Sequence, residues 1–255
     1  SDQFILNSLY TFTHNSSPGT NPPYSYRLLG SFEPAGNLAG LLVQSRNADG
    51  QKTILGRPFA QYVRLDFDAR QYWRVAPRLT WATRLFAGAG FSYGNLTQMP
   101  FVKQYFVGGA NSVRAFRPRT VGPGILEKAS DGLPLFSDGG GDIKLEANTE
   151  LRSVFNKYLQ GALFVDAGNV WLYKDPTPNS TSVFTRNFLR ELAVGAGVGL
   201  RIDMQYFLLR FDLATPLRKP FLPEGQRWVL SQFNLGDRDW RRENLVLNIA
   251  VGYPF

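Results

Sequence analysis

The chain has 255 residues, no cysteine, one histidine and a formal net charge of +8. The lack of cysteine excludes disulfides and thiolate metal sites, and a single histidine, His14, disfavours a histidine metal cluster or a serine–histidine–aspartate triad. We therefore expect no cofactor and no metal. The 28 Lys and Arg residues are spread along the chain without a run, which disfavours a nucleic-acid partner.

The composition favours β-structure. Phe (20), Tyr (11) and Trp (5) are abundant, and 25 Gly and 16 Pro residues supply turns. The mean hydropathy is −0.20. No apolar run reaches the roughly 18 residues of a membrane-spanning helix. The strands of a transmembrane β-barrel escape such a search, because their apolar and polar residues alternate.

Up to residue 88, this alternation predicts four strands, near residues 3–13, 24–33, 60–71 and 77–88. The third contains VRLDFDAR, in which every second residue from Val63 to Ala69 is apolar and the others are charged. The charged face carries both signs, so we expect ion pairs there rather than acid–base catalysis; its members are Arg64, Asp66, Asp68 and Arg70. Segment 34–44 predicts a short helix within a loop, and QYWRVA predicts a turn.

The long connection over residues 89–142 is too apolar for a solvated loop. Its apolar residues include Phe101, Tyr105, Phe106, Val107, Val113, Phe116, Ile125 and Leu126. These side chains need to be buried, and in a barrel the available space is the lumen. The run Gly139 to Gly141 near its end predicts a flexible hinge.

After this connection, five more strands are predicted near residues 143–153, 159–167, 190–203, 206–215 and 245–254. In GAGVG, the glycines fall on the face opposite the large apolar residues, so we interpret them as lumen-facing residues that leave room for the loop. A dinucleotide loop is disfavoured, since no βαβ unit surrounds them. The last strand has one apolar face, made of Leu245, Leu247, Ile249, Val251, Tyr253 and Phe255. We expect its final aromatic residues to lie in the girdle at the membrane boundary.

These strands predict an all-β fold, a transmembrane antiparallel β-barrel, in preference to a soluble sandwich or barrel with its apolar face inward. Several of the strands are about ten residues or longer, close to the about 9–11 residues of membrane strands and above the about 5–6 typical of soluble ones. Short turns also alternate with long loops, as in outer-membrane barrels. Bacterial barrels have even strand numbers, whereas nine strands are predicted. We therefore expect residues 1–255 to be a partial barrel domain, with N-terminal strands and any periplasmic domains outside this chain.

The segment GGANSVRAFRPRTVGPG, residues 108–124, resembles the signature loop of the outer-membrane assembly-factor superfamily, of the BamA and TamA type. The family core Val/Ile-Arg-Gly-Phe/Tyr is matched by Val113, Arg114, Ala115 and Phe116, with Ala115 in place of the usual glycine. Two further motifs follow in the family's order: GALFVDAGNVW, with Phe164 and Asp166, and VGAGVGLRID. The resemblance covers about residues 100–255 and is closest to the TamL-like branch.

This resemblance implies a 16-stranded barrel in which the long loop folds back into the lumen. It also implies that Arg114 pairs with Asp166, with Phe164 and Phe116 packed beside them. The alternation agrees, because Leu163 and Val165 on the lipid side put Phe164 and Asp166 inside. An arginine suits this place, since its planar fork can bind a carboxylate through two hydrogen bonds.

The function implied by the resemblance is non-enzymatic insertion or export of β-rich polypeptides through a lateral seam in the outer membrane. Gly252, Tyr253 and Phe255 would belong to the seam and targeting strand. The expected partners are unfolded outer-membrane clients, outer-membrane lipid and lipopolysaccharide, and accessory subunits. Two alternatives stay open: a two-partner secretion pore for one passenger, and a barrel that anchors a lipolytic enzyme. For the enzyme, we expect no Gly-x-Ser-x-Gly motif within this stretch. A passive porin is disfavoured by a plugged lumen.

Overall fold

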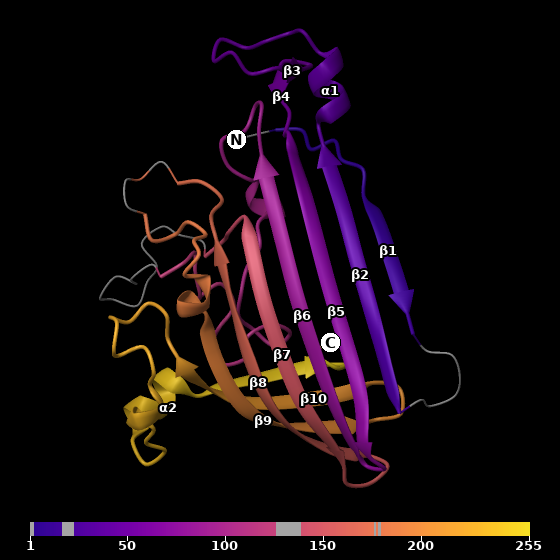
Figure 1. Ribbon diagram of the computed structural model, residues 1–255, viewed down its shortest axis with the longest axis vertical. Coiled ribbons are helices and arrows are strands. Elements are labelled where there is room, and N and C mark those ends of the chain that lie inside the picture. The colour runs from indigo at the N-terminus through magenta and orange to yellow at the C-terminus, as the bar shows by residue number, and fades with distance from the viewer. Residues whose placement is uncertain (1–2, 17–22, 126–138, 176, 178–179) are drawn as a thin grey trace.

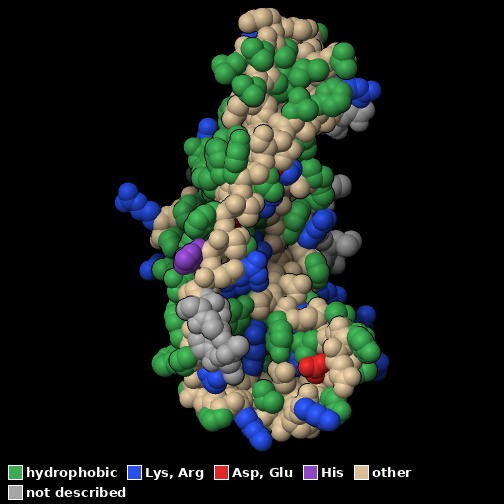
Figure 2. All heavy atoms as spheres, turned by 90° about the vertical axis from the view of Figure 1, so that its right-hand side faces the viewer, with side chains coloured by type: hydrophobic (Ala, Val, Ile, Leu, Met, Phe, Trp, Pro, Cys, Tyr) green, Lys and Arg blue, Asp and Glu red, His purple; other side chains and the backbone are tan. Residues whose placement is uncertain are grey.

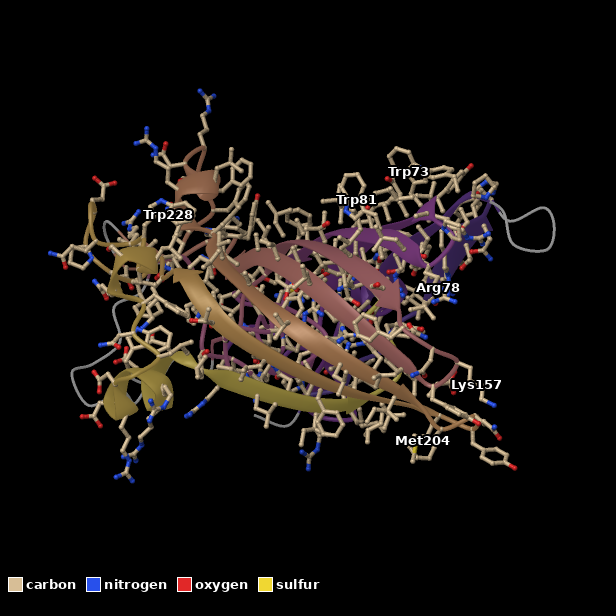
Figure 3. The ribbon with its side chains drawn as sticks, turned by 90° about the horizontal axis from the view of Figure 1, so that it is seen from below. Trp73, Arg78, Trp81, Lys157, Met204 and Trp228 are labelled. Atoms are coloured by element: carbon tan, nitrogen blue, oxygen red, sulfur yellow. The ribbon has the colours of Figure 1, made fainter. Side chains whose placement is uncertain are left out.

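Nine strands form one antiparallel sheet that curls around an interior space (Figures 1 and 3). The computed structural model describes residues 3–16, 23–125, 139–175, 177 and 180–255. The strands lie in the order β1-β2-β5-β6-β7-β8-β9-β10-β11, and β3 pairs with β4 in a separate hairpin. The predicted all-β antiparallel fold is confirmed, with a wall that corresponds to part of a barrel.

The large sheet contains β1 (Tyr10–Asn15), β2 (Tyr24–Ala35), β5 (Tyr62–Ala76), β6 (Leu79–Ser92), β7 (Ile143–Val154), β8 (Leu159–Trp171), β9 (Ala193–Asp203), β10 (Leu208–Arg218) and β11 (Val246–Val251). The connections contain β3 (Thr53–Ile54), β4 (Arg57–Pro58), the helices α1 (Asn37–Leu42) and α2 (Arg238–Asn244), and the 3₁₀ turns η1 (Phe101–Lys103), η2 (Phe188–Glu191) and η3 (Leu230–Gln232). The nine predicted strands and the short helix within segment 34–44 are therefore confirmed.

Two predicted boundaries are wrong. QYWRVA is not a turn, because β5 continues through it to Ala76 and the turn consists of Pro77 and Arg78. Aromatic and β-branched residues favour a strand there, and Trp73 of β5 stacks on Trp81 of β6 with ring centroids 6.1 Å apart. The first strand begins late, at Tyr10; before it, Phe4 and Asn7 make isolated bridges.

The sheet buries its polar face and exposes its apolar face, the reverse of a soluble protein. On β7 and β8, Glu150 and Asp166 are 0% exposed, whereas Leu163 is 58% exposed. The expected ion pairs on β5 are present, with Arg70 bound to Asp68 at 3.0 Å and Arg64 to Asp66 at 3.4 Å. The alternative of a soluble barrel with its apolar face inward is therefore wrong. Among the described residues, no helix has both the length and the apolar character to cross a membrane.

The short turns gather at one end of the sheet and the long connections at the other (Figure 1). At the short-turn end, the Val154 amide donates to the Arg78 carbonyl at 2.8 Å and the Asp203 amide to the Tyr158 carbonyl at 2.8 Å. These bonds join the three turns into one rim. Strand β11 ends at the same rim, where the Gly252 amide donates to the Leu208 carbonyl at 2.8 Å.

At the opposite end, α1 and the β3–β4 hairpin project beyond the sheet. Figure 2 shows hydrophobic side chains gathered at this end of the molecule. They include four strongly exposed leucines, Leu38, Leu41, Leu42 and Leu55. Long apolar connections thus lie at the end that outer-membrane barrels turn to the cell exterior.

Candidate functional site: the inner loop and its anchor

The connection between β6 and β7 returns into the space that the sheet encloses. We call its described parts, residues 93–125 and 139–142, the inner loop. Its side chains form a core inside the sheet, where Val107, Val113 and Val121 are 0% exposed. Phe101 departs from the expectation of burial, since it is 43% exposed and packs edge-on against Phe106. Leu126 lies outside the described residues.

Glycines in β6 make room for this loop. A Cβ atom at Gly88 would lie 2.6 Å from the ring of Tyr105, and one at Gly90 would lie 2.8 Å from Met99. The Tyr105 hydroxyl donates to Asp66 of β5, and Arg64 lies over its ring at 4.3 Å. Burial, together with the bond to Asp66, raises the pKa of the Tyr105 phenol, which therefore stays protonated as a donor.

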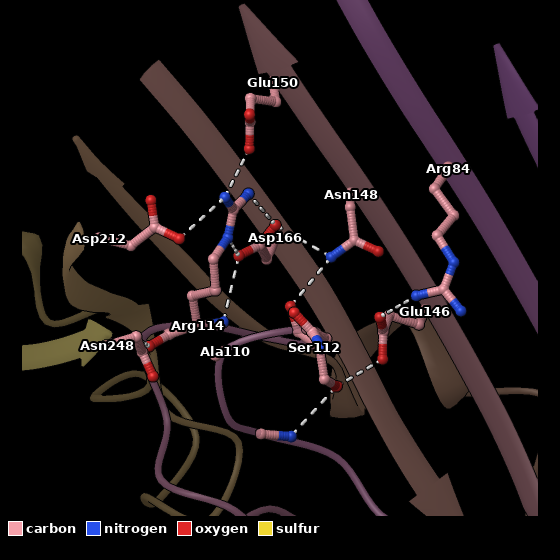
Figure 4. A network of polar contacts seen from close by, with 12 residues as sticks. Arg84, Ala110, Ser112, Arg114, Glu146, Asn148, Glu150, Asp166, Asp212 and Asn248 are labelled. Carbon is pink, nitrogen blue, oxygen red and sulfur yellow. Dashed lines mark hydrogen bonds and ion pairs between the residues drawn. The ribbon is translucent and has the colours of Figure 1, made fainter. Parts of the chain in front are cut away.

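Arg114 lies at the centre of the site, fully buried among three carboxylates (Figure 4). Its Nε donates to Asp166 Oδ2 at 2.8 Å and its Nη2 to Asp166 Oδ1 at 2.9 Å, a two-bond fork. Its Nη1 donates to Glu150 at 2.5 Å and lies 3.6 Å from Asp212. We call Arg114, Glu150, Asp166 and Asp212 the anchor cluster. The structure thus brings together Arg114 and Asp166, the two residues whose pairing the family resemblance implies.

Burial of the guanidinium would by itself lower the pKa of Arg114. The hydrogen bonds and charge of Asp166, with the charges of Glu150 and Asp212, outweigh burial and raise that pKa above its ordinary value. Further arginines neutralise the remaining acidic charge. Arg201 binds Glu150 at 3.0 Å and Asp212 at 2.7 Å, and Arg152 binds Glu150 at 2.9 Å.

The flanks of Arg114 are held as well. The guanidinium lies 3.4 Å from the centroid of the Phe164 ring, a cation–π contact. Phe116 and Val113 belong to the buried cluster of the inner loop. The Ser112 hydroxyl donates to Glu146 at 2.5 Å, and Asn148 donates to both the Ser112 carbonyl and Asp166. Loop backbone and side chains are therefore fixed to β7 and β8 together.

The unusual Ala115 has a local explanation. It is not among the described residues with positive φ, so glycine is not required by the backbone at this place. A Cβ atom at Gly195 of β9 would lie 2.1 Å from the Ala115 methyl group. Gly195 therefore leaves the space that the methyl group fills. A Cβ at Gly197 would lie 2.5 Å from Phe164, so the GAGVG glycines leave room as expected.

Glu150, Asn148 and Asp212 were not singled out as site residues from the sequence. The signal was present for the first two, since both fall on the polar face of β7, opposite the Phe164 and Asp166 positions of β8. Asp212 is harder to find, because it reaches the cluster from β10, which does not neighbour β7 or β8. The family motif alone does not include it.

The last residues differ from the expectation. Strand β11 ends at Val251, and Gly252, with φ of 84°, turns the chain away from the strand path. Phe255 is therefore not on the lipid-facing side but 7% exposed, with Arg152 above its ring at 5.3 Å. Tyr253 stays 44% exposed beside the short-turn rim, with Arg152 at 4.5 Å from its ring centroid and its hydroxyl donating to Gln160 at 2.9 Å. The predicted girdle position is therefore wrong for Phe255.

Two further expectations are wrong. Gly140 and Gly141 are not a flexible hinge: they are buried, and Gly141 pairs with Tyr105 in both directions, at 2.8 and 2.9 Å. The stretch also contains a Gly-x-Ser-x-Gly motif, GFSYG at Gly90–Gly94. Ser92 is the last residue of β6, opposite Tyr62, and a turn follows instead of a helix. The strand–turn–helix of a nucleophile elbow is therefore lacking at this motif.

Comparison with known proteins agrees with this architecture. Residues 40–238 match the family model described as the Omp85 superfamily domain. The outer membrane protein assembly factor BamA of Neisseria meningitidis serogroup B is 27% identical over an alignment of 168 residues, and the match covers 58% of this chain and 20% of that protein. The chain thus spans about a fifth of this curated relative.

Two solved structures share the fold. BamA from Haemophilus ducreyi lacking POTRA domains 1–3 has a TM-score of 0.50 and 17% identity, over 84% of this chain and 52% of that chain. CdiB from Escherichia coli has a TM-score of 0.50 and 18% identity, over 79% of this chain and 31% of that chain. Since the family model covers most of its length, the chain belongs to the Omp85 superfamily of integral outer-membrane β-barrel proteins.

Proposed function

We propose that this sheet is the C-terminal part of a larger barrel that inserts β-rich client polypeptides into the outer membrane through a seam beside β11. The observation that carries the proposal is the short ladder of that strand. β11 has 6 residues, whereas β10, its partner, has 11. A short terminal ladder is a weak point in a barrel wall, at which an incoming strand can add to an edge.

The surroundings of β11 support this. Its ladder to β10 runs from the pair Val246–Ala214 to the pair Val251–Leu209. Beyond it, β10 is covered by another segment, in which Trp228 pairs with Arg218 and the Val229 amide donates to Leu217. Past the other end, Pro254 has no amide hydrogen to extend the ladder.

The inner loop is proposed to position this strand. Asn248 of β11 donates through Nδ2 to the Arg114 carbonyl at 2.9 Å. The residue that binds Asp166 through its side chain therefore holds the terminal strand through its backbone. In this scheme the anchor cluster keeps β11 in register while its outer edge stays available, and no cofactor or covalent step is involved.

The proposed partners follow from the relative named an outer membrane protein assembly factor. They are unfolded outer-membrane clients, lipid and lipopolysaccharide of the outer membrane, and accessory subunits of an assembly complex. A lipolytic activity of this stretch is not proposed, since Ser92 is built into a strand pair.

Cysteine cross-linking tests the seam, because this stretch contributes no cysteine of its own. Leu247 of β11 and Leu213 of β10 are direct cross-strand partners on the same lipid-facing side. In the full-length protein, Leu247→Cys should form disulfides with cysteines placed in the terminal strand of a client during assembly. Leu213→Cys is the matched control, since its strand is paired on both sides.

The competing secretion pore predicts a different pattern. A passenger that crosses the lumen would contact Ala250, whose cross-strand partner Arg210 is buried inside the sheet. Cross-links at Ala250→Cys without cross-links at Leu247→Cys would favour that pore. Equal yields at Leu247→Cys and Leu213→Cys would contradict insertion at the seam.

A further inference from the structure

The outer face of β6 to β9 is hollowed close to the short-turn rim. In the row nearest the rim, Ser153 and Gly161 lie between Leu79 and Leu200. In the next row, by contrast, Leu151 and Leu163 lie beside Trp81. Small residues between large ones leave a depression in a surface that the membrane covers.

Two adjoining hollows result, and they share Leu151 and Leu163 as a common ridge. The one at the rim, of about 350 Å³, is lined by Leu79, Ser153, Phe155, Gly161 and Leu200. The one nearer the middle of the sheet, of about 440 Å³, is lined by Trp81, Thr149, Val165 and Ala196. Both volumes fall within the about 300–1,000 Å³ usual for ligand sites. The lining is almost entirely apolar.

The walls of the hollows are fixed. The Trp81 Nε1 donates to the Thr149 hydroxyl at 2.7 Å, and its ring stacks on Trp73. At the rim, the ring of Phe155 lies over Gly161, where a Cβ atom would be only 2.6 Å from the ring. Since these aromatic side chains are held in place, they do not collapse into the space between them.

Cations stand at the short-turn rim, next in the chain to residues that line the rim hollow, since Arg78 precedes Leu79 and Lys157 follows two residues after Phe155. Arg78, Lys157 and Met204 project from the turns at one end of the sheet, while Trp73 and Trp81 lie on its outer surface (Figure 3). The backbone bonds of the rim bring the Arg78 turn against Val154, beside Phe155. Asp203, the acid at the end of β9, accepts from the Gln205 amide. Arg78 and Lys157 are exposed, and the Lys157 ammonium lies 4.6 Å from the centroid of the Tyr158 ring, itself an exposed side chain, so an anionic group can approach both cations.

In a membrane, burial of apolar surface alone selects no ligand, because every lipid chain is equally apolar. Selection then comes from close packing and from charge at the headgroup level. The groove supplies a shaped apolar wall and the rim supplies positive charge. The short turns of outer-membrane barrels face the periplasm, so the available lipid is that of the inner leaflet.

We propose that this groove binds one diacyl phospholipid of the inner leaflet, with an acyl chain along Leu151 and Leu163 and its phosphate at Arg78 and Lys157. The site lies on the wall directly behind the anchor cluster, since Leu151 follows Glu150 and Leu163 precedes Phe164. A bound chain would therefore support the two strands that carry Glu150 and Asp166. This proposal rests on the location of the sheet in the outer membrane, and it does not require that clients insert at the seam beside β11.

The test is native mass spectrometry of the full-length protein, titrated in detergent with dioleoyl-phosphatidylglycerol. The parent should retain one phospholipid. Ser153→Leu fills the rim hollow and should lower the bound fraction several-fold. Lys157→Gln should weaken binding by roughly fivefold at low salt, since a lysine near an anionic headgroup is worth about 1 kcal/mol. Folding of each variant is checked by the shift of its gel band on heating.

Each variant has a matched control. Ala147→Leu makes the same kind of change on the same face of β7 but outside both hollows, and Lys174→Gln removes a lysine at the long-connection end. Neither should alter retention. If the parent and Ser153→Leu retain the same fraction of phospholipid, the proposed site is wrong. It is also wrong if Ser153→Leu and Ala147→Leu lose phospholipid to the same extent. Displacement of the phospholipid by lipopolysaccharide would overturn the choice of ligand.

Discussion

At the residue scale, Arg114 is a buried charge, and hydrogen bonds to neighbouring carboxylates offset the desolvation of its guanidinium. Asp166 provides a two-bond fork, and Glu150 adds a third charge-assisted bond. Desolvation of such a group is expensive, so its net contribution depends on every bond being made. Loss of one partner leaves an uncompensated charge inside the sheet.

Arg114→Ala and Asp166→Ala should each therefore lower the free energy of unfolding by about 3–5 kcal/mol. Arg114→Lys should recover part of this at most, since a lysine cannot reproduce the fork to Asp166. The measurement is denaturant unfolding in detergent. Arg117→Ala, on the exposed side of the same loop, is the control and should leave stability unchanged. Parent-like stability and function in both alanine variants would refute the anchoring role.

Ala115 and Gly195 form a second residue-scale unit, because one fills the space that the other leaves. Gly195→Ala should place two methyl groups 2.1 Å apart, forcing the loop from the wall. Overpacking of this kind costs about 1–3 kcal/mol. The double variant Gly195→Ala with Ala115→Gly should restore most of the stability, as measured in the same unfolding experiment.

Gly30→Ala on β2 is the control, since a Cβ there meets nothing within 4 Å. If Ala115→Gly does not restore the stability lost in Gly195→Ala, the contact between these two residues is not the reason that position 195 requires glycine.

At the element scale, the sequence predicts faces better than ends. The two faces of β7 and β8 follow from strict alternation, and so do the positions of Phe164 and Asp166 inside. The end of β5 does not follow from the local sequence. Trp73 stacks on Trp81 of the neighbouring strand β6, and this contact between strands is not visible in the segment QYWRVA alone. The buried position of Phe255 also escapes prediction, since alternation stops where Gly252 adopts positive φ.

The terminal strand offers an element-scale prediction. Asn248→Ala removes the bond from β11 to the Arg114 carbonyl. Local opening depends on the contacts that an element keeps, so backbone amides of Val246–Val251 should exchange with deuterium faster. The ladder between β9 and β10 should be unaffected. Hydrogen–deuterium exchange followed by mass spectrometry measures both regions.

Ile249→Ala, on the lipid-facing side of β11, is the comparison, because it removes apolar area without touching the inner loop. Equal protection of β11 in Asn248→Ala and the parent would mean that the inner loop does not hold the strand.

At the scale of the whole molecule, charge lies inside the sheet and apolar surface outside. Ion pairs continue from β5 to β7, where Arg84 bridges Asp68 at 2.9 Å and Glu146 at 3.0 Å. The inner loop fills the remaining space with its own apolar core. The apolar outer face therefore suits apolar surroundings, and the cost of an outward charge should depend on its depth.

Two positions on β10 test this dependence. Leu213 and Leu209 share the lipid-facing side, and Leu209 lies beside the short-turn rim while Leu213 lies four residues further along the strand. At about 3.3 Å per residue and a tilt of about 40°, Leu213 comes close to the middle of the hydrocarbon layer. Leu213→Arg should therefore cost about 2–4 kcal/mol and Leu209→Arg about 0–1 kcal/mol.

Reversible folding of the full-length protein into phospholipid vesicles measures both costs. The comparison uses one strand, one face and one substituted residue type, so depth is the main variable. A large cost at Leu213 with a small one at Leu209 supports a wall that spans the membrane with its short turns at the interface. Equal costs at the two positions would mean that this face does not cross the hydrocarbon layer in the direction inferred from the turns.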